Sequence, residues 1–309
     1  MNYAFTNGKI LDGSRDMQVQ TGRCILVKNG KIHDIVPDTA DLSGYTKIDL
    51  KGHYILPGLI NMHVHLAGSG KPQKKQRDNE KLVNTIMSTS LTRAIAYRMV
   101  AGFAKDELLS GVTTIRTVGG PGDFDTRLRD EIKAGTKIGP RILASNQGIS
   151  VPGELKMPPE MVRAVCEKAH ADGYLVAAHV ESPEGVRVAL ENGVDSIEHG
   201  AKLTDEMVKL FKERGAFLCT TISPALPYAL FDRSITNATK RSAELTDIDS
   251  ITGSIEKGKA ADLIVTAQNP LKDLKALRNL EMVISGGRFI EHPKIKKRKQ
   301  VEAELDKFL

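Results

Sequence analysis

The apolar positions between about residues 57 and 245 form short runs that alternate with amphipathic stretches. The runs are rich in β-branched and aliphatic residues and predict strands at 111–118, 140–145, 174–179, 193–199 and 216–221. The amphipathic stretches predict helices at 80–109, 160–172, 183–192 and 204–214. Strands that are apolar almost throughout and alternate with helices indicate a parallel sheet covered by helices, an α/β fold.

The two ends of the chain have a different pattern. Residues 2–50 hold short strand-like pieces, and the pairs Asn7-Gly8 and Asn29-Gly30 predict hairpin turns. Similar pieces return at 253–265 and 282–290. The domain boundaries predicted from this pattern are a composite β-sheet domain of residues 1–56 and 250–293, an α/β barrel domain of residues 57–249, and a basic helical tail of residues 294–309.

The stretch 52–66 is the part of the sequence that most directly indicates a metal site. It is an apolar segment entered through Pro57-Gly58, and it ends with His63 and His65. Residues two apart on a strand share a face, so the two imidazoles converge while Val64 faces away. Neutral imidazole is a common metal ligand, and two on one rigid strand form half of a zinc site. A metal-free pair of polar histidines is the plainer alternative, but the Pro-Gly entry and the apolar run favour the metal.

Two further histidines end predicted strands. His179 closes the strand 174–179 and His199 closes the strand 193–199. A (β/α)8 barrel keeps its active site at the carboxyl ends of its strands, so four imidazoles from three strands predict a divalent metal. Zinc is expected first, although imidazole also binds iron, nickel and copper. The other four histidines are expected to be structural or solvated: His33, His53, His170 and His292.

Composition narrows the class of protein. The chain has 309 residues, of which 40% are hydrophobic and 27% charged, as in an ordinary globular protein. No apolar run approaches the roughly 18 residues of a membrane span, and the start lacks a secretory pattern, so we expect no membrane partner. Three cysteines without a CxxC pair, Cys24, Cys166 and Cys219, indicate a reducing cytoplasm and small buried side chains.

The net charge of +6 does not indicate a nucleic-acid partner. The basic residues concentrate in 71–77 and 294–299, and neither run is interleaved with aromatic residues. Solvated surface is therefore expected at both. The sequence leaves the oligomeric state open, a homo-oligomer included.

The motifs taken together resemble the amidohydrolase superfamily, in particular the branch of imidazolonepropionase-like proteins and metal-dependent, prolidase-type dipeptidases. The matching segments are 57–65, 111–114, 178–180, 196–200 and 253–263. The resemblance implies a (β/α)8 TIM-type barrel with a small composite sheet domain, and one or two divalent ions. His63 and His65 would bind one metal, and His179 and His199 the other. A metal-activated water would attack an amide carbonyl.

The chain departs from the family pattern in two places. The family has a carbamylated lysine on a strand, yet residues 146–154 hold no lysine on an apolar strand. The family also has a last barrel strand that ends in an aspartate, which binds metal and serves as the base, yet near 235–238 the only acid is Asp232, which lies in no predicted strand. Residues 59–245 are also fewer than the roughly 250 of a complete barrel. Either segments are missing near 149–152 and 235–238, or a natural deletion has left an open barrel. The catalytic base and the lysine therefore remain unassigned.

These observations favour a metal-dependent hydrolase that cleaves an amide or peptide bond of a small substrate, such as a dipeptide or an N-acyl amino acid. A non-catalytic metal-binding or scaffold protein is the alternative, and a deaminase on the same scaffold ranks third. Tyr228, in a loop after a strand, would contact the substrate or pack as a loop aromatic. Arg116, near the end of its strand, would meet a substrate carboxylate or form a structural ion pair.

Overall fold

The computed structural model describes residues 2–66, 85–146, 148, 157–220, 234–295, 303 and 306. The chain divides into two compact units, one of residues 1–146 with 227–309 and one of residues 147–226. This division falls inside the stretch 57–249, and the domain boundaries drawn from the sequence stay predictions. Within the described ranges, no helix has the length and apolar character needed to cross a membrane.

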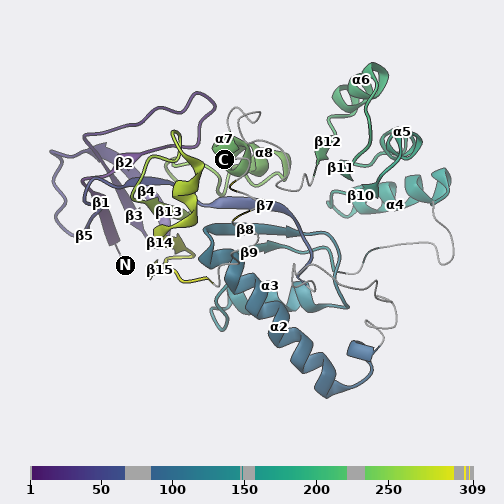
Figure 1. The fold of residues 1–309 in the computed structure, drawn as a ribbon, viewed down its shortest axis with the longest axis horizontal. Helices are drawn as coiled ribbons and strands as arrows, with labels where there is room; N and C mark the ends of the chain where they lie inside the picture. Colours follow the sequence, from purple (N-terminus) through teal and green to yellow (C-terminus); the bar gives the residue numbers. More distant parts are fainter. Residues whose placement is uncertain are drawn as a thin grey trace. The chain divides into compact units, whose positions relative to one another are not determined.

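Two sheets of the first unit are built from the ends of the chain (Figure 1). One has the order β4-β3-β1-β5, with bounds Asn2–Thr6 (β1), Arg23–Lys28 (β3), Lys31–Pro37 (β4) and Thr46–Asp49 (β5). The other has the order β15-β14-β13-β6-β2, with bounds Lys9–Ile10 (β2), Tyr54–Pro57 (β6), Leu263–Thr266 (β13), Leu280–Ser285 (β14) and Arg288–Glu291 (β15). In the second sheet β13 pairs antiparallel with β6, and Val265 lies opposite Ile55. Strands from both ends of the chain therefore share one sheet.

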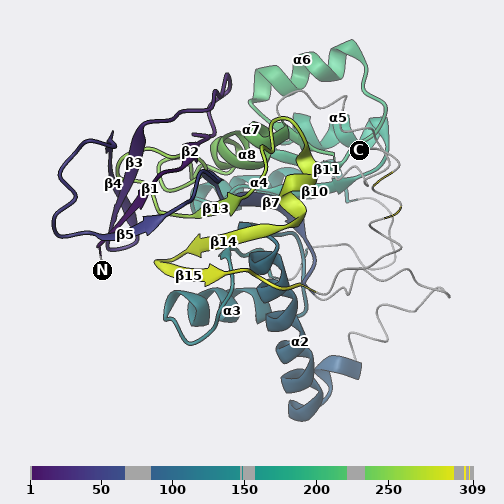
Figure 2. The ribbon, with the colours of Figure 1, turned by 60° about the vertical axis from the view of Figure 1, so that its left-hand side comes forward.

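The two sheets share a core. Phe5 and Ile25 from the first sheet pack with Ile55, Val265 and Ile284 from the second, and all five are at most 2% exposed. Figure 2 shows the β14–β15 hairpin that extends the second sheet. Burying such apolar side chains, four of the five aliphatic, is the main stabilising term available to a chain with few aromatic residues.

The hairpin predictions have different outcomes. Asn29-Gly30 joins the antiparallel strands β3 and β4, and both residues have positive φ, 51° and 75°, as a tight hairpin turn requires. The prediction at Asn7-Gly8 is wrong, because β1 and β2 lie in different sheets. Asn7, with φ 52°, instead turns the chain from one sheet to the other, and its side-chain amide donates to Asp49 Oδ1 at 3.1 Å.

A third sheet of the first unit is parallel, with the order β7-β8-β9. Its strands are Leu59–Val64 (β7), Val112–Thr117 (β8) and Arg141–Leu143 (β9), and its helices are Ser90–Leu109 (α2) and Phe124–Lys133 (α3). Val64, Ile115 and Ile142 from the strands pack with Tyr97 and Leu128 from the helices. Gly58 allows β7 to begin beside β8, because an added Cβ would lie 2.1 Å from Thr113 Oγ1.

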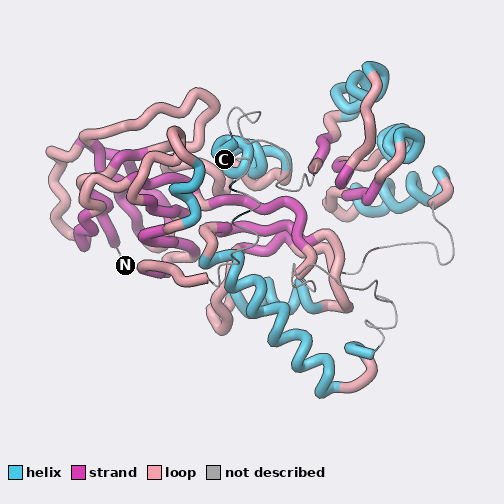
Figure 3. The backbone as a smooth tube through the Cα atoms, in the orientation of Figure 1, coloured by secondary structure: helices cyan, strands magenta, loops and turns pink. Residues whose placement is uncertain are grey.

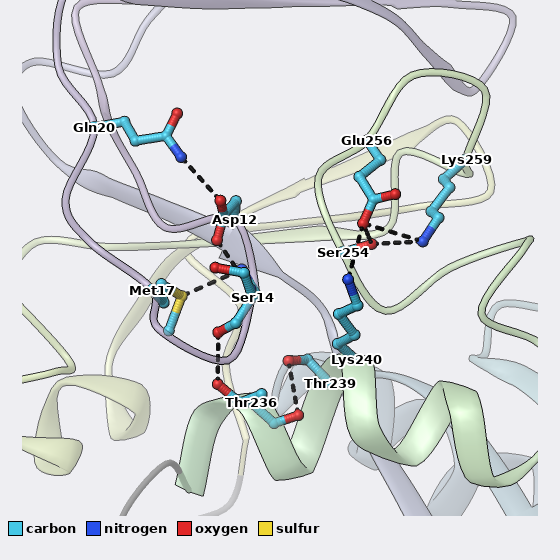
Figure 4. Close-up of polar contacts among 11 residues, drawn as sticks. Asp12, Ser14, Met17, Gln20, Thr236, Thr239, Lys240, Ser254, Glu256 and Lys259 are labelled. Atoms are coloured by element: carbon cyan, nitrogen blue, oxygen red, sulfur yellow. Dashed lines mark hydrogen bonds and ion pairs between the residues drawn. The ribbon is translucent and has the colours of Figure 1, made fainter.

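A helical segment of the first unit runs without interruption through Ser234–Thr236 (α7), the π-helical turn Asn237–Arg241 (η2) and Ser242–Leu245 (α8). Polar contacts tie it to the ends of the chain (Figure 4): Thr236 Oγ1 donates to the Ser14 carbonyl at 2.9 Å, and Lys240 pairs with Glu256 at 3.5 Å. Glu256 also accepts from Ser254 Oγ at 2.6 Å. The suspected junction at 235–238 therefore lies inside a continuous helical segment, at the start of its π-helical turn. The suspected junction at 149–152 lies outside the described residues.

The second unit is a smaller parallel sheet with helices, of order β10-β11-β12 (Figure 3). Its elements are Pro159–Ala171 (α4), Ala177–Val180 (β10), Pro183–Glu191 (α5), Ser196–His199 (β11), Asp205–Arg214 (α6) and Phe217–Cys219 (β12). The strand predicted from residue 174 begins only at Ala177, because Tyr174 is bonded back to the end of α4 through its N–H. Tyr174 and Leu175 are 69% and 57% exposed.

The first unit also contains a 3-10 turn, Leu274–Arg278 (η3), before β14. Arg278 pairs with Asp306 at 2.8 Å. Most of the tail 294–309, predicted to be a helix, lies outside the described residues; Ala303 and Asp306 are helical.

Candidate metal centre

The end of β7 brings His63 and His65 together in the first unit. Their ring centroids are 5.0 Å apart and the ring planes meet at 76°. Val64 between them is 7% exposed and packs in the core, whereas His63 is partly exposed and His65 exposed. The side chains therefore alternate as the sequence predicts, with the two imidazoles away from the core.

A backbone contact orients the second of these rings. His65 Nδ1 lies 3.2 Å from the carbonyl oxygen of Gly119, in the loop that follows β8. A carbonyl oxygen only accepts hydrogen bonds, so Nδ1 carries the proton and Nε2 keeps its lone pair when the ring is neutral. Metal-binding histidines in proteins are commonly held in this way.

Two carboxyl groups that contact β7 or His65 were not identified from the sequence. Asp125, in the first turn of α3, is 2% exposed, and burial raises its pKa against the opposing effects of hydrogen bonds from Thr117 and Asn146 and of the His65 charge. Burial also raises the pKa of Glu107 on α2, which accepts from Asn61 Nδ2 at 3.4 Å. Both lie in polar stretches of helix, where the sequence gives no signal that an acid is buried.

The second unit brings His179 and His199 together. They end the neighbouring parallel strands β10 and β11, and their ring centroids are 4.4 Å apart with the planes at 68°. His199 has φ +68°, a left-handed conformation that costs a non-glycine residue about 1–2 kcal/mol. Such strain often accompanies functional positions. His179 Nε2 is also 3.7 Å from Glu181 Oε1, and both side chains are largely exposed.

Glu198 is a buried acid beside this second pair, and it too was not singled out from the sequence. It is 2% exposed, lies opposite His179 in the strand register, and accepts from Ser196 Oγ at 2.8 Å. A carboxylate oxygen of Glu198 and Sγ of Cys219 lie within 4.8 Å of each other. Its position inside the motif 196–200, directly before a strand-ending histidine, was the available signal.

The remaining predicted site residues lie as follows. Arg116 is on β8, where its Nε donates to the Met62 carbonyl at 2.7 Å and so anchors β7 directly before His63. Tyr228 and Asp232 lie outside the described residues. Cys24 and Cys166 are buried and burial raises the pKa of both thiols, whereas Cys219 is only partly buried, which corrects the expectation for that residue.

Three of the four other histidines make contacts away from these pairs. His170 Nε2 lies 2.8 Å from Asp195 Oδ2, and His292 Nδ1 lies 3.2 Å from Glu281 Oε2. The carbonyl of His53 accepts from the backbone N–H of Lys9. The structural or solvated roles expected for these histidines stay predictions.

Each unit thus presents two imidazoles at the carboxyl ends of parallel strands. Imidazole nitrogen suits zinc and related transition metals, and the Gly119 contact leaves Nε2 of His65 as a donor. Within the described parts of β7 to β12, there is neither a lysine nor an aspartate. The bridging lysine and the aspartate base of the family pattern are therefore not supplied by these strands.

Comparison with known proteins confirms the superfamily resemblance. Residues 54–156 match the model of the amidohydrolase family. An imidazolonepropionase of Klebsiella pneumoniae is 32% identical over 169 residues, which cover 49% of this chain and 39% of the relative. A dihydroorotase of Trichlorobacter lovleyi is 26% identical over 216 residues, which cover 65% of this chain and 48% of the relative. The chain spans about half the length, or less, of these curated relatives.

The fold is similar to that of prolidase-type amidohydrolases. The crystal structure of a putative prolidase from Bifidobacterium longum superposes with a TM-score of 0.80 at 26% identity, covering 99% of this chain and 98% of that chain. Imidazolonepropionases and dihydroorotases are thus homologues of the chain, and a putative prolidase is a structural neighbour along nearly its whole length.

Proposed function

We propose that this chain, whose residues 54–156 match the amidohydrolase family, is a metal-dependent hydrolase of an amide or peptide bond in a small molecule. One observation carries the proposal. Each of the two units places two imidazoles at the carboxyl ends of parallel strands, with ring centroids 5.0 Å apart in one pair and 4.4 Å apart in the other.

The four histidines are the proposed metal ligands: His63 and His65 for one ion, His179 and His199 for another. Zinc is the first choice because neutral imidazole is among its preferred donors. A bound divalent ion would polarise the scissile carbonyl and acidify a water. The Gly119 carbonyl holds the proton of His65 on Nδ1, and Arg116 fixes the strand directly before His63.

The proposed fold is the (β/α)8 barrel, and each unit by itself contains a three-stranded parallel sheet with helices, the arrangement that such a barrel repeats. The proposed substrates are dipeptides or N-acyl amino acids, and the similarity to a putative prolidase supports the dipeptide. Tyr228 is kept as a proposed substrate contact. The Arg116 guanidinium, which already donates to a backbone carbonyl, is better explained as a support for β7 than as a substrate contact.

A non-catalytic metal-binding protein is the second candidate. The observation that favours it is the composition of the six parallel strands, whose described residues include neither the lysine nor the aspartate of the family pattern. Such a protein would bind metal through the same histidines and would hydrolyse no amide.

Metal content and hydrolysis, measured on the same preparation, separate the two candidates. The full chain is loaded with Zn²⁺ or Mn²⁺, dialysed, and its metal is counted by plasma mass spectrometry. Hydrolysis is followed with a panel of dipeptides, including X-Pro, and of N-acyl amino acids. The double variants His63→Ala/His65→Ala and His179→Ala/His199→Ala are compared with His292→Ala, whose side chain is 74% exposed and remote from both pairs in the sequence.

Each outcome decides between the candidates. Metal and hydrolysis that both fall in the two double variants, but not in His292→Ala, support the hydrolase. Bound metal without hydrolysis of any substrate in the panel supports the non-catalytic metal-binding protein. A wild-type chain that retains no metal contradicts both.

A further inference from the structure

The loop after β8 that contacts His65 is held by a buried carboxylate. Asp125 is 2% exposed, and the Thr117 hydroxyl and the Asn146 backbone N–H both hydrogen-bond its carboxyl group. Its Oδ2 is buried and has no hydrogen-bond partner among the described residues. Leaving a buried acceptor unpaired is costly, which indicates a role for this carboxylate other than stability.

The two donors come from the ends of neighbouring parallel strands. Thr117 is the last residue of β8, and Asn146 follows β9 with φ +58°. Thr117 Oγ1 also accepts from the Ser145 N–H at 3.1 Å, and Asn146 Oδ1 accepts from the Thr126 N–H at 3.2 Å. Asp125 therefore joins the first turn of α3 to the carboxyl ends of β8 and β9.

The same group of contacts fixes the glycine loop. The Asn146 carbonyl accepts from the Gly120 N–H at 2.8 Å, and an added Cβ at Gly120 would lie 3.1 Å from Asp125 Oδ1. Gly119, with φ +131°, adopts a conformation that favours glycine, and its carbonyl faces His65 Nδ1 at 3.2 Å. The loop thus packs tightly on the carboxylate and presents one carbonyl to the imidazole.

From this chain of contacts we infer that Asp125 is a positioning residue: its buried carboxylate, packed beside Gly120, holds the Gly119 carbonyl in place and thereby keeps His65 in the Nδ1–H tautomer, with Nε2 free to donate to a metal. The consequence for metal binding rests on the proposed function, but the consequence for the tautomer does not. Removing a residue that orients a metal-binding histidine typically lowers metal affinity by about 10–100-fold.

The tautomer of His65 can be read directly from the ¹⁵N shifts that its ring shows in the uncharged form in the metal-free protein. In the wild type we expect Nδ1 protonated. In Asp125→Ala, which removes the acceptor, we expect a shift toward the Nε2–H form that a solvated imidazole prefers. In Asp125→Asn, which keeps one acceptor oxygen, we expect the wild-type tautomer to return.

Zn²⁺ affinity, measured by competition with a chromogenic chelator, is the second readout. It should fall by about 10–100-fold in Asp125→Ala and change little in Asp125→Asn. Asp123→Ala is the matched control, because this acid is exposed and makes no side-chain cap bond to α3. Should Asp125→Ala fail to fold, Thr117→Val removes one of the two donors together with the acceptor of the Ser145 N–H, whereas Thr117→Ser keeps the hydroxyl; the shift toward Nε2–H is expected in Thr117→Val and not in Thr117→Ser.

The outcomes keep the two proposals apart. A folded Asp125→Ala protein whose His65 stays in the Nδ1–H tautomer, with unchanged Zn²⁺ affinity, overturns the positioning role and leaves the proposed function intact. A wild type that binds no Zn²⁺, but whose His65 tautomer depends on Asp125, overturns the proposed function and leaves the positioning role intact.

Discussion

At the scale of single residues, Gly58 marks the tightest steric constraint on the strand that carries the first histidine pair. An added Cβ would lie 2.1, 2.3 and 2.7 Å from three side-chain atoms of Thr113, which is fully buried. Gly58→Ala should therefore lower the free energy of unfolding by about 1–3 kcal/mol, measured by urea denaturation.

Gly102→Ala is the matched control for that substitution. Gly102 lies in α2 with no heavy atom within 4 Å of an added Cβ, so alanine should stabilise the helix by about 0.5–1 kcal/mol. Equal unfolding midpoints for Gly58→Ala and the wild type would contradict the close approach of β7 and β8.

The half-buried carboxyl of Glu107 leads to a prediction about the pH dependence of stability. Its folded pKa is raised above the ordinary value of 4.5, chiefly by burial, so the fold favours the protonated form. The contribution of Glu107 to stability should then be greatest at low pH and fall as the pH rises from its unfolded pKa through its folded one. Glu107→Gln removes the titration, so its free energy of unfolding should fall less between pH 4 and pH 7 than that of the wild type. Parallel pH curves for the two proteins would argue against a buried acid here.

The histidine pairs could be located from the sequence, whereas the acids around them could not. Alternation along a strand is local, so His63 and His65 converge wherever that strand lies. Burial of Asp125, Glu107 and Glu198 depends on what packs over them, which is set by residues far away in the chain. The sequence therefore predicts the imidazoles but not the groups that orient them.

At the scale of elements, Asp262 connects strands that are distant in the sequence. Its buried carboxylate pairs with Arg141 of β9 at 3.0 Å and accepts from Thr252 and Ser285 hydroxyls at 3.2 Å each. Asp262→Ala would leave these donors unpaired, and we expect a loss of about 2–4 kcal/mol in unfolding free energy, discounted because the Arg141 side chain is 35% exposed.

An exposed ion pair provides the comparison for Asp262. Lys168 and Asp172 pair on the surface at the end of α4, with side chains 75% and 48% exposed. Asp172→Ala should change stability by less than about 1 kcal/mol in the same urea titration. A loss at Asp262 no greater than that at Asp172 would show that the buried contacts do not hold these strands together.

Secondary structure could be predicted from the sequence where the hydrophobic pattern repeats over many residues. The prediction failed where contacts with distant parts of the chain override the local pattern. The helices of the α/β region and the Asn29-Gly30 hairpin follow from local pattern. Asn7-Gly8 has the same turn signal, but the partner of the following strand is β6, so the chain crosses to another sheet. The apolar Tyr174 and Leu175 look like a strand, yet they form part of the turn that ends α4.

At the scale of the whole molecule, metal binding should be linked to stability. A ligand that binds only the folded state at 100 times its Kd adds about 2.7 kcal/mol. Zn²⁺ should therefore raise Tm in a thermal melt, and a chelator should reverse the rise. The rise should be smaller in His63→Ala/His65→Ala and unchanged in His292→Ala. An identical rise in all three proteins would place the metal elsewhere.

The pairing of β6 with β13 has a consequence for synthesis. The two strands lie roughly 200 residues apart in the sequence, and a ribosome that adds 5–20 residues per second needs about 10–40 s to cover that distance. Throughout that interval the nascent chain carries β6, with Ile55 and Leu56 that are fully buried in the finished sheet, without its β13 partner. The sheet domain is thus completed late in translation, and until then the yield of folded protein depends on what shields that apolar edge.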